Sequence, residues 1–487
     1  MKSPGDPRLT GTSVVAPVQV QDQDVPQRLF GTDGIRGCFG YYPLERALIE
    51  QVAYELTRSL SAPDGRKPLV VAGGDTREST EEIARWIAAG VSAGGGVVRW
   101  AGVIPTPGVA WLVRHLSADA GVVISASHNP HPDNGVKILS TDGFKLGDEA
   151  ELQIEAGVHG SRHMPARDAN AFEALAVEEE LREAYAAELL SRSRENGSST
   201  DPNLQLGGLR VGLDAGNGAA TPLAARLFEQ LGATVQIVGD RPDGRNVNAG
   251  CGSTSPENLA RLVREHGLDI GFAFDGDADR VIACDDQGTV RDGDDLLYLW
   301  ARHLARAGLL APAAVVVTSM SNLGLEHALR RDGIEVVRCD VGDRQVVETL
   351  RARGLILGGE PSGHLVHLGL ATTGDGLLTA LQVAGIVRRA AVPASRLFDG
   401  FERFPQVLRN VRVTAKPAFA SVDGLSELVA RVEHRLGDDG RLVLRYSGTE
   451  PLVRVMIEGQ DAATIDQLAA ELTAFFEQRL GIETTHV

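Results

Sequence analysis

Short runs of β-branched and other apolar residues alternate with longer amphipathic stretches through most of this chain. A short apolar run predicts a buried strand, and an alanine- and leucine-rich stretch with helical spacing predicts a helix. Regular alternation of the two is typical of βαβ units around a mixed or mostly parallel sheet. Examples of such strand and helix pairs are Leu69–Ala72 with Glu81–Ala93, Leu209–Leu213 with Pro222–Leu231, and Ala314–Thr318 with Gly324–Arg331.

The C-terminal part of the chain has a different pattern. Strand-like runs at Val407–Val413, Leu442–Leu444 and Val453–Glu458 are mixed with helical stretches at Leu425–Arg435 and Ala462–Leu480. We therefore predict an α/β fold in which three similar α/β domains precede a smaller α+β domain. The predicted segments are a disordered tail at 1–27, domain I at 28–165, domain II at 166–288, domain III at 289–398 and domain IV at 399–487.

Composition narrows the class of protein. The 487 residues are 43% hydrophobic and 23% charged, as in ordinary soluble globular proteins. The net charge of −17 argues against a nucleic-acid partner, because such binding needs clustered lysine and arginine. No apolar run approaches the ~20 residues of a membrane span. The four cysteines (Cys38, Cys251, Cys284 and Cys339) lack metal or disulfide spacing, so we expect reduced, mostly buried thiols in a cytoplasmic protein.

A serine motif stands out near the end of the first predicted domain. The segment 121–130 ends in Ser-His-Asn-Pro, directly after an apolar run that predicts a buried strand. A turn-rich segment ending at 133–135 follows, and then Lys137, one of only five lysines in the chain. A serine hydroxyl is a weak nucleophile that needs a base and charge neutralisation. With His128 and Lys137 beside it, Ser127 is a candidate carrier of a phosphoryl group; the alternative is a serine that caps a turn.

Three aspartates at alternate positions form a second motif. Asp275, Asp277 and Asp279 follow the apolar run Ile270–Phe274, at a strand end where α/β sheets keep their ligand sites. A tight loop can direct all three carboxylates at one hard cation. An EF-hand does not fit, because arginine and aspartate occupy its glycine and glutamate positions. A solvated acidic turn is the alternative; we favour a divalent metal site for Mg²⁺.

Three further segments offer groups for an anionic sugar. The glycine-dense stretch 30–37 carries Arg36, a second positive charge to place near the serine. Around 360–364, a carboxylate, a hydroxyl and an imidazole can bind sugar hydroxyl or amino groups, although a lone histidine is as often structural. The stretch 445–454 combines two arginines with two hydroxyls and a glycine, which suits a phosphate group better than an ordinary exposed turn.

These loops, in this order, resemble those of the α-D-phosphohexomutase superfamily, and most closely those of its phosphoglucosamine mutase family. The resemblance extends from about residue 28 to the last predicted helix. The segments that resemble the phosphoglucosamine mutase family in particular are Leu29–Arg36, Asn246–Thr254, Met320–Leu325 and Val341–Arg344. Gly74 departs from the pattern, because the family commonly has arginine there.

The resemblance implies a four-domain enzyme with one loop from each domain around a central cleft. Ser127 would be phosphorylated, its oxygen sharing one Mg²⁺ with Asp275, Asp277 and Asp279, and a sugar 1,6-bisphosphate would act as activator and intermediate. Arg36, His128 and Lys137 would assist the transfer. The residues implied in substrate binding are Arg280, Glu360, Ser362, His364, Arg445, Ser447, Gly448, Thr449 and Arg454.

The predicted reaction is the interconversion of glucosamine 6-phosphate and glucosamine 1-phosphate, an isomerase-class phosphotransfer that feeds UDP-N-acetylglucosamine synthesis. The expected partner is a small hexosamine phosphate, and the expected assembly is a monomer or a homodimer. A phosphoglucomutase/phosphomannomutase with the same mechanism is the alternative, and an inactive sugar-phosphate-binding protein is a second one. Alkaline phosphatase-type hydrolysis is disfavoured, because one aspartate cluster offers no second metal site.

Overall fold

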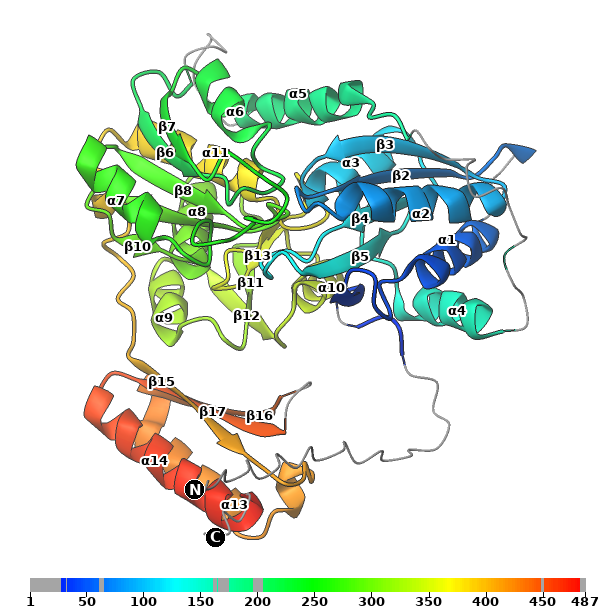
Figure 1. Ribbon diagram of the computed structural model, residues 1–487. Helices are drawn as coiled ribbons and strands as arrows, with labels where there is room; N and C mark the ends of the chain where they lie inside the picture. The colour runs from blue at the N-terminus through cyan, green and yellow to red at the C-terminus, as the bar shows by residue number, and fades with distance from the viewer. Residues whose placement is uncertain are drawn as a thin grey trace, which may run out of the picture.

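Four β-sheets, each with its own helices, follow one another along the chain (Figure 1). The computed structural model describes residues 28–31, 33–60, 65–160, 164, 175–195, 205–447 and 451–481. Three mixed sheets precede a smaller antiparallel sheet, which confirms the predicted α/β fold with its α+β domain at the C-terminus. The predicted tail, 1–27, lies outside the described residues, and the exact limits of the four domains stay a prediction.

Domain I contains a five-stranded sheet between two layers of helices. Its elements are β1 (Ile35–Cys38), α1 (Arg46–Ser59), β2 (Leu69–Gly74), α2 (Thr80–Ala93), β3 (Val97–Val103), α3 (Thr106–His115), β4 (Ala120–Ile124), β5 (Asp133–Leu139) and α4 (Asp148–His159). The strand order is β1-β5-β4-β2-β3, with β2, β3 and β4 parallel. Val70 and Val122 pack with α1 and α2, whereas Val71 and Val123 pack with α3, because successive strand side chains point to opposite faces.

Domain II repeats this arrangement with the strand order β10-β9-β8-β6-β7. Its elements are α5 (Glu179–Glu195), β6 (Arg210–Asp214), α6 (Ala224–Gln230), β7 (Thr234–Val238), α7 (Glu257–His266), β8 (Ile270–Phe274), β9 (Val281–Asp285) and β10 (Val290–Arg291). Strand β8 has the predicted bounds, and all of its residues are buried. The aspartate motif therefore begins where this central strand ends.

Domain III contains a four-stranded sheet in the order β12-β11-β13-β14. Its elements are α8 (Gly293–Arg306), β11 (Ala314–Thr318), α9 (Leu323–Arg331), β12 (Glu335–Cys339), α10 (Asp343–Arg353), β13 (Leu357–Gly359), β14 (Leu365–His367), α11 (Gly376–Ala390) and α12 (Ala394–Leu397). The turn between β13 and β14 contains the predicted sugar loop at 360–364.

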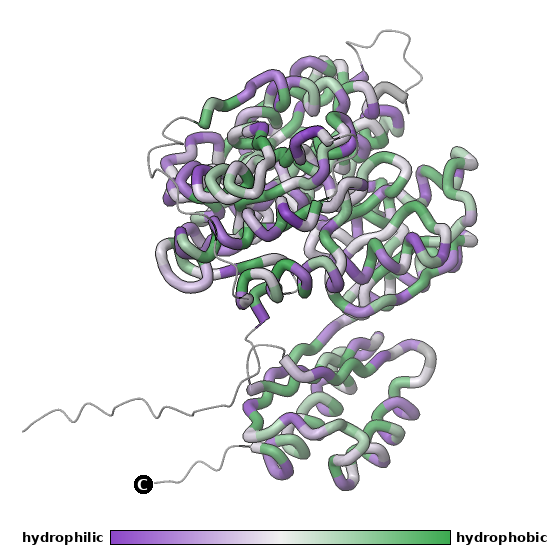
Figure 2. Tube along the Cα trace, turned by 90° about the vertical axis from the view of Figure 1, so that its right-hand side faces the viewer, coloured by the Kyte–Doolittle hydropathy of each residue, from purple (hydrophilic) through white to green (hydrophobic). Residues whose placement is uncertain are grey.

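Domain IV is an antiparallel sheet, β15-β17-β16, covered by helices. Its elements are β15 (Gln406–Arg412), η2 (Phe419–Ser421), α13 (Leu425–Leu436), η3 (Gly437–Asp439), β16 (Gly440–Tyr446), β17 (Leu452–Gly459) and α14 (Ala462–Leu480). The two views in Figures 1 and 2 show it as a separate lower body, joined to the rest through the segment before β15.

One connected hydrophobic core joins the first three domains. Val123 of the first sheet, Phe272 of the second and Val317 of the third belong to the same set of buried side chains. Domain IV has a core of its own, built from its sheet, α13 and α14. The shared core fixes three of the four loops relative to one another, whereas the fourth is carried by a separately packed domain.

The turn-rich reading of 133–135 is wrong. These residues begin strand β5, which pairs antiparallel with β4 on one side and with β1 on the other. Pairing of these three residues with β1, continued by the pairing of 136–139 with β4, outweighs the turn preference of Asp, Asn and Gly. Lys137 consequently lies in the middle of a strand, opposite Val123, with its side chain held in place by the sheet.

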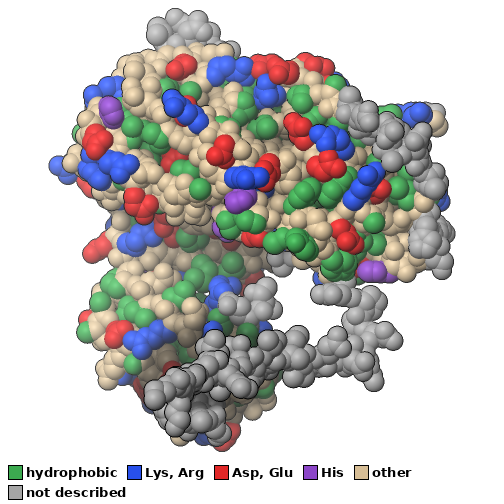
Figure 3. Space-filling view, viewed as in Figure 1, with side chains coloured by type: hydrophobic (Ala, Val, Ile, Leu, Met, Phe, Trp, Pro, Cys, Tyr) green, Lys and Arg blue, Asp and Glu red, His purple; other side chains and the backbone are tan. Residues whose placement is uncertain are grey.

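The surface carries few long apolar features. None of the helices in the described ranges combines the length and the apolar character needed to cross a bilayer. Acidic and basic side chains are interspersed over the face seen in Figure 3.

The four cysteines are free, but only Cys251 and Cys284 are buried; Cys38 is exposed and Cys339 partly exposed, because both end an edge strand.

Candidate active site

Ser127 lies in a strained, buried loop directly after β4. Its side chain and backbone are only 2% exposed, and its φ of 52° is in the left-handed region that non-glycine residues rarely adopt. Its N–H donates to Ser125 Oγ at 2.9 Å, and Ser125 Oγ in turn donates to Asp75 Oδ2 at 2.6 Å. Strained backbone of this kind persists where the surroundings over-determine it, and it concentrates at functional sites.

Two donors that the sequence did not single out hold the carbonyl side of this loop. Arg77, whose side chain is fully buried, donates to the carbonyl oxygens of Ser127 at 3.2 Å, Asn129 at 2.9 Å and Pro130 at 2.8 Å. From domain II, Asn248 Nδ2 donates to the carbonyl of Ser127 at 2.9 Å. The serine loop is thus clamped from both domains, and the only sequence signal was that Asn248 falls in a segment that resembles the phosphoglucosamine mutase family.

The aspartate loop of domain II approaches the serine loop very closely. Ser127 Oγ donates to Asp275 Oδ2 at 2.5 Å. A Cβ at Gly276 would lie 2.4 Å from the carbonyl oxygen of Ser127, so only glycine allows this approach. Thr106, at the start of α3, donates from its hydroxyl to Asp277 Oδ2 at 2.6 Å and from its N–H to the Asp277 carbonyl at 3.0 Å. The predicted serine and metal motifs therefore form one site.

The three aspartates are suited to a hard cation. Asp275, Asp277 and Asp279 are buried and offer ligand oxygens that all lie within 4.8 Å of one another. The Oδ1 atoms of Asp277 and Asp279 are buried with no hydrogen-bond partner among the described residues. Burial together with the charges of Asp279 and Asp277 raises the pKa of Asp275 well above its ordinary value. Arg280 Nε lies 3.7 Å from Asp279 Oδ1 at this end of the cluster, but the unpartnered carboxylate oxygens still present the electrostatic demand that a divalent ion meets.

Lys137 neutralises the other end of the cluster. Its Nζ lies 3.0 Å from Asp277 Oδ2, 3.3 Å from Asp33 Oδ2 and 3.6 Å from Asp279 Oδ2. Burial alone would lower the pKa of Lys137, but the three carboxylates raise it, so the amine is a fixed ammonium. A fixed ammonium favours an electrostatic role for Lys137 over the role of base that the sequence left open, and the assignment stays a prediction.

His128 and Arg280 lie over the serine hydroxyl. His128 Nδ1 is 3.4 Å from Ser127 Oγ and 3.3 Å from Arg280 Nη1. Burial and the positive charge of Arg280 lower the pKa of His128, so the imidazole is neutral near pH 7 and can accept a proton. The backbone N–H of Arg280 donates to Asp275 Oδ1 at 3.1 Å, and the Arg280 guanidinium lies 3.7 Å from Asp279 Oδ1 through its Nε, so both parts of Arg280 contact the aspartate loop.

The sugar loop of domain III faces the same region. Glu360 is 8% exposed; its Oε1 accepts from the Gly342 N–H at 3.1 Å, and Ser362 Oγ lies 3.4 Å from its Oε2. His364 is buried, accepts at Nε2 from the Gly374 N–H at 3.1 Å, and places Nδ1 3.7 Å from Asp279 Oδ2. His364 therefore contacts the aspartate loop, and its expected role in substrate binding stays a prediction.

The residues predicted to bind the non-reacting phosphate lie on domain IV. Arg445 and Arg454 are direct cross-strand neighbours on β16 and β17, and burial together with the charge of Arg454 lowers the pKa of Arg445. Two guanidiniums held side by side favour an anion between them. Ser447 is buried next to them, and Lys416 Nζ donates to its carbonyl at 2.5 Å. Gly448 and Thr449, also predicted here, lie outside the described residues.

This geometry can be set beside known proteins. Four family models match the chain in succession, and they are described as alpha/beta/alpha domains I, II and III and the C-terminal domain of phosphoglucomutase/phosphomannomutase. They cover residues 27–163, 183–288, 292–404 and 408–475. The chain belongs to the phosphoglucomutase/phosphomannomutase family. The resemblance seen in the sequence is thereby confirmed.

Several similar proteins of this family are phosphoglucosamine mutases. The chain is 43% identical over 466 residues to a phosphoglucosamine mutase from Syntrophotalea carbinolica, covering 94% of this chain and 99% of that protein. It is 45% identical over 457 residues to a phosphoglucosamine mutase from Symbiobacterium thermophilum, covering 93% and 99%. Among solved structures, a phosphoglucomutase/phosphomannomutase family protein from Burkholderia thailandensis has the same fold, with a TM-score of 0.73, 23% identity, and coverage of 94% and 98%.

A more distant structure carries amino-sugar chemistry on the same fold. It is the N-acetylphosphoglucosamine mutase of Aspergillus fumigatus, in complex with GlcNAc-6P and magnesium. Its TM-score is 0.60 at 18% identity, with 93% of this chain and 96% of that chain covered. At this identity the likeness concerns the fold alone.

Proposed function

We propose that this protein is a phosphoglucosamine mutase, which interconverts glucosamine 6-phosphate and glucosamine 1-phosphate through a phosphorylated Ser127. The observation that carries the proposal is the contact of Ser127 Oγ with Asp275, with His128 Nδ1 3.4 Å from the same hydroxyl and Lys137 paired with Asp277 of the same loop. The full-length relatives at 43–45% identity support the amino-sugar substrate. The three carboxylates of Asp275, Asp277 and Asp279 suit Mg²⁺, which would neutralise charge on the phosphoryl oxygens when bound.

The first half-reaction is transfer from phospho-Ser127 to the sugar. The bond between phosphorus and Ser127 Oγ breaks while the C1 hydroxyl oxygen of glucosamine 6-phosphate bonds to phosphorus, which gives the 1,6-bisphosphate. Neutral His128 accepts the hydroxyl proton. Lys137 and Arg36 contribute fixed positive charge on the side of Ser127, which stabilises the transferring group without forming covalent bonds.

The second half-reaction returns a phosphoryl group to the serine from the other end of the sugar. The bisphosphate turns over between the loops, and its 6-phosphoryl group bonds to Ser127 Oγ while the bond between phosphorus and O6 breaks. O6 takes the proton held by His128, and glucosamine 1-phosphate leaves. Arg445, Ser447 and Arg454 hold whichever phosphate is not reacting, while Glu360 and Ser362 orient the sugar. Closure of domain IV over the other three domains excludes water that would hydrolyse the phosphoserine.

The test is a specificity ratio. kcat/KM is measured for glucosamine 6-phosphate, glucose 1-phosphate and mannose 1-phosphate, with Mg²⁺ and a catalytic amount of the matching sugar bisphosphate. A strong preference for glucosamine 6-phosphate is the expected result. Preference for glucose or mannose would keep the mechanism and replace the substrate. Absence of turnover with all three, together with no phosphorylated fraction by intact mass, would instead support an inactive sugar-phosphate-binding protein.

A further inference from the structure

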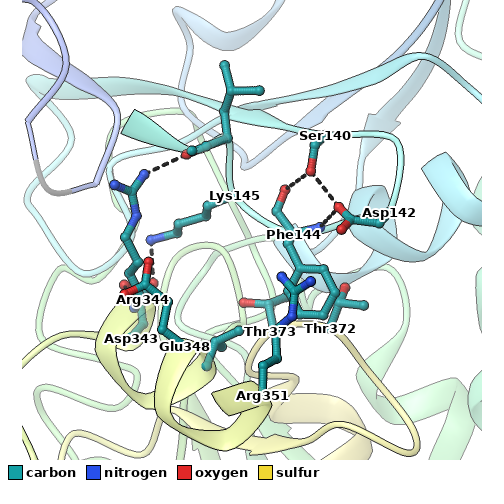
Figure 4. A pocket seen from close by; sticks show the side chains of 13 residues that line it. Ser140, Asp142, Phe144, Lys145, Asp343, Arg344, Glu348, Arg351, Thr372 and Thr373 are labelled. Carbon is teal, nitrogen blue, oxygen red and sulfur yellow. Dashed lines mark hydrogen bonds and ion pairs between the residues drawn. The ribbon is translucent and has the colours of Figure 1, made fainter. Parts of the chain in front are cut away.

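Lys145 bridges two carboxylates from different domains. It follows β5 in domain I, and its Nζ makes ion pairs with Asp33 of the same domain and with Asp343 at the start of α10 in domain III. Figure 4 shows the Lys145 ammonium reaching toward Asp343 across the boundary between the two domains. Its side chain is 15% exposed, so the bridge is largely shielded from solvent.

Asp33 is shared by three cations. One oxygen pairs with Lys145, and the other contacts the Arg36 guanidinium and lies 3.3 Å from Lys137 Nζ. Arg36 Nε also donates to the Asp33 carbonyl at 3.1 Å. Burial alone would raise the pKa of Asp33, but Lys137, Lys145 and Arg36 hold it well below its ordinary value. The carboxylate is thus ionised, and its charge is divided between Lys145 and the two cations beside Ser127.

The other end of the bridge leads to the sugar loop. Asp343 directly follows Gly342, whose N–H donates to Glu360 Oε1 at 3.1 Å. Glu360, which holds the sugar in the proposed function, is therefore connected to Asp33 through Gly342, Asp343 and Lys145. Asp33 in turn contacts Arg36 and Lys137, the cations proposed to assist phosphoryl transfer. Neither Lys145 nor Asp33 was expected to contribute from the sequence.

We propose that Lys145 is a positioning residue for phosphoryl transfer: by neutralising Asp33, it leaves Arg36 and Lys137 with positive charge to offer the phosphoryl group. Without Lys145, the whole charge of Asp33 acts on Arg36 and Lys137. These cations then stabilise the developing negative charge of the transition state less well. The inference rests on the proposed function for the reaction and adds a residue that touches neither sugar nor phosphate.

The surroundings allow the residue to be changed. Lys145 lines a cavity of about 290 Å³ between domains I and III, together with Phe144, Thr372 and Arg351 (Figure 4). A side chain of similar length without the charge fits this space, so Lys145→Met removes the ammonium without forcing the domains apart.

Arg344 provides a matched control at the same interface. Its guanidinium pairs with Asp148, donates to the Leu146 carbonyl at 2.6 Å and lies 3.0 Å from Glu151 Oε1. These contacts join domain III to domain I without involving Asp33, Arg36 or Lys137. Arg344→Gln therefore weakens the docking of the domains and leaves the charges beside Ser127 as they are.

The experiment is a double-mutant cycle between Lys145→Met and Asp33→Asn, with kcat and KM measured for the hexose phosphate that the wild-type enzyme prefers. Lys145→Met is expected to lower kcat about 10- to 100-fold with KM nearly unchanged, and to cost less than about threefold in the Asp33→Asn background. Lys145→Arg should recover most of the activity, and Arg344→Gln should lower kcat by less than about threefold.

Equal losses in both backgrounds, or equal losses for Lys145→Met and Arg344→Gln, would overturn the inference and reduce Lys145 to a link between domains. Thermal unfolding midpoints of all variants show whether a loss follows stability instead. The cycle uses whichever hexose phosphate the wild-type enzyme prefers. If that sugar is not glucosamine, the proposed function fails, but the effect of Lys145 on phosphoryl transfer can still be measured.

Discussion

Ser127 Oγ donates a 2.5 Å hydrogen bond to Asp275 Oδ2, although the two residues are 148 positions apart and belong to different domains. The contact exists because Gly276 lets the domain II loop approach the Ser127 carbonyl and because Asn248 and Arg77 fix that carbonyl. It brings a hydroxyl of one domain together with a carboxylate of the candidate metal site in another.

Replacing the phosphorylated hydroxyl tests the nucleophile. Ser127→Ala is expected to lower turnover by several orders of magnitude, because no other hydroxyl can carry the phosphoryl group at this position. The assay is steady-state conversion of glucosamine 6-phosphate with sugar bisphosphate present. Ser125→Ala is a useful comparison, because it removes the hydrogen bonds of Ser125 Oγ with the Ser127 N–H and with Asp75 but keeps the Ser127 hydroxyl. Near-normal turnover of Ser127→Ala would contradict the phosphoserine assignment.

Chelation and carboxylate replacement test the metal site. Removal of divalent ions should abolish turnover, and added Mg²⁺ should restore it. Asp275→Asn should raise the Mg²⁺ concentration for half-maximal activity by roughly 100-fold or more, since even outer-shell partners are worth 10–100-fold in metal affinity. Asp240→Asn, on a loop of the same domain, is the control. An unchanged Mg²⁺ requirement in Asp275→Asn would remove this carboxylate from the metal site.

The hydrogen bond from Asn248 to the Ser127 carbonyl predicts that a residue with no part in the chemical step affects kcat. Asn248→Ala should lower kcat about 10- to 100-fold with little change in KM, because a small displacement of Ser127 misaligns the transfer. Asn258→Ala removes a hydrogen bond to Gly250 of the same segment without contacting the serine loop, and it should have little effect. A kcat loss of the same size in both variants would mean that only the fold of the segment matters.

The arginine pair of domain IV predicts the opposite kinetic pattern. Arg445→Gln should raise KM about tenfold or more with a smaller effect on kcat, because the phosphate held there does not react. Arg412→Gln, on an exposed position of β15 in the same sheet, provides the matched loss of charge. A fall in kcat at unchanged KM would place Arg445 in the chemical step instead.

A buried carboxylate predicts a pH dependence of stability. Burial raises the pKa of Asp375, which caps α11, to about 6. Because the folded pKa exceeds the unfolded value of about 3.9, its contribution to stability is present at low pH and is lost as the pH rises through about 6. The Tm of the wild type should therefore rise relative to that of Asp375→Asn as the pH falls from about 8 to about 5.

Asp286 provides the control for this pH series. Burial alone would raise the pKa of Asp286, but hydrogen bonds from Ser395 and Gln287 lower it. Its contribution is present above the unfolded pKa and is lost only below it, so the Tm difference between wild type and Asp286→Asn should stay flat over the same range. A flat difference for Asp375→Asn as well would show that this carboxyl is not protonated near pH 6.

The sequence predicts much of the fold because local pattern and burial agree. The apolar run Ile270–Phe274 has the bounds of β8, and the alanine-rich stretch Ala462–Leu480 has those of α14. Strand β5 was missed because Asp, Asn and Gly at its start favour turns, and only pairing with β1 and β4 reveals a strand. Patterns within a segment cannot show a partner strand distant in the chain.

The residues of the candidate site likewise fall into those that local motifs predict and those that only the structure reveals. Ser127, Lys137 and the three aspartates were found because their chemistry is written in local motifs. Lys145 and Asn248 make contacts between domains, and Asp33 pairs with lysines that are distant in the chain. A lone aspartate, lysine or asparagine carries no local sign of such contacts. The contacts of the His364 ring with the Gly374 N–H and with Asp279 of domain II were not expected from the sequence, and its predicted substrate contact stays a prediction.

The most direct test of the account is to follow the phosphoryl group on the enzyme itself. The wild-type protein is loaded with glucosamine 1,6-bisphosphate and Mg²⁺, the modified peptide is identified by mass, and the loaded enzyme is then chased with glucosamine 6-phosphate. The account predicts one phosphoryl group on Ser127 that is discharged into the sugar within a turnover. A phosphoryl group on another residue, or one on Ser127 that the sugar does not discharge, would contradict it.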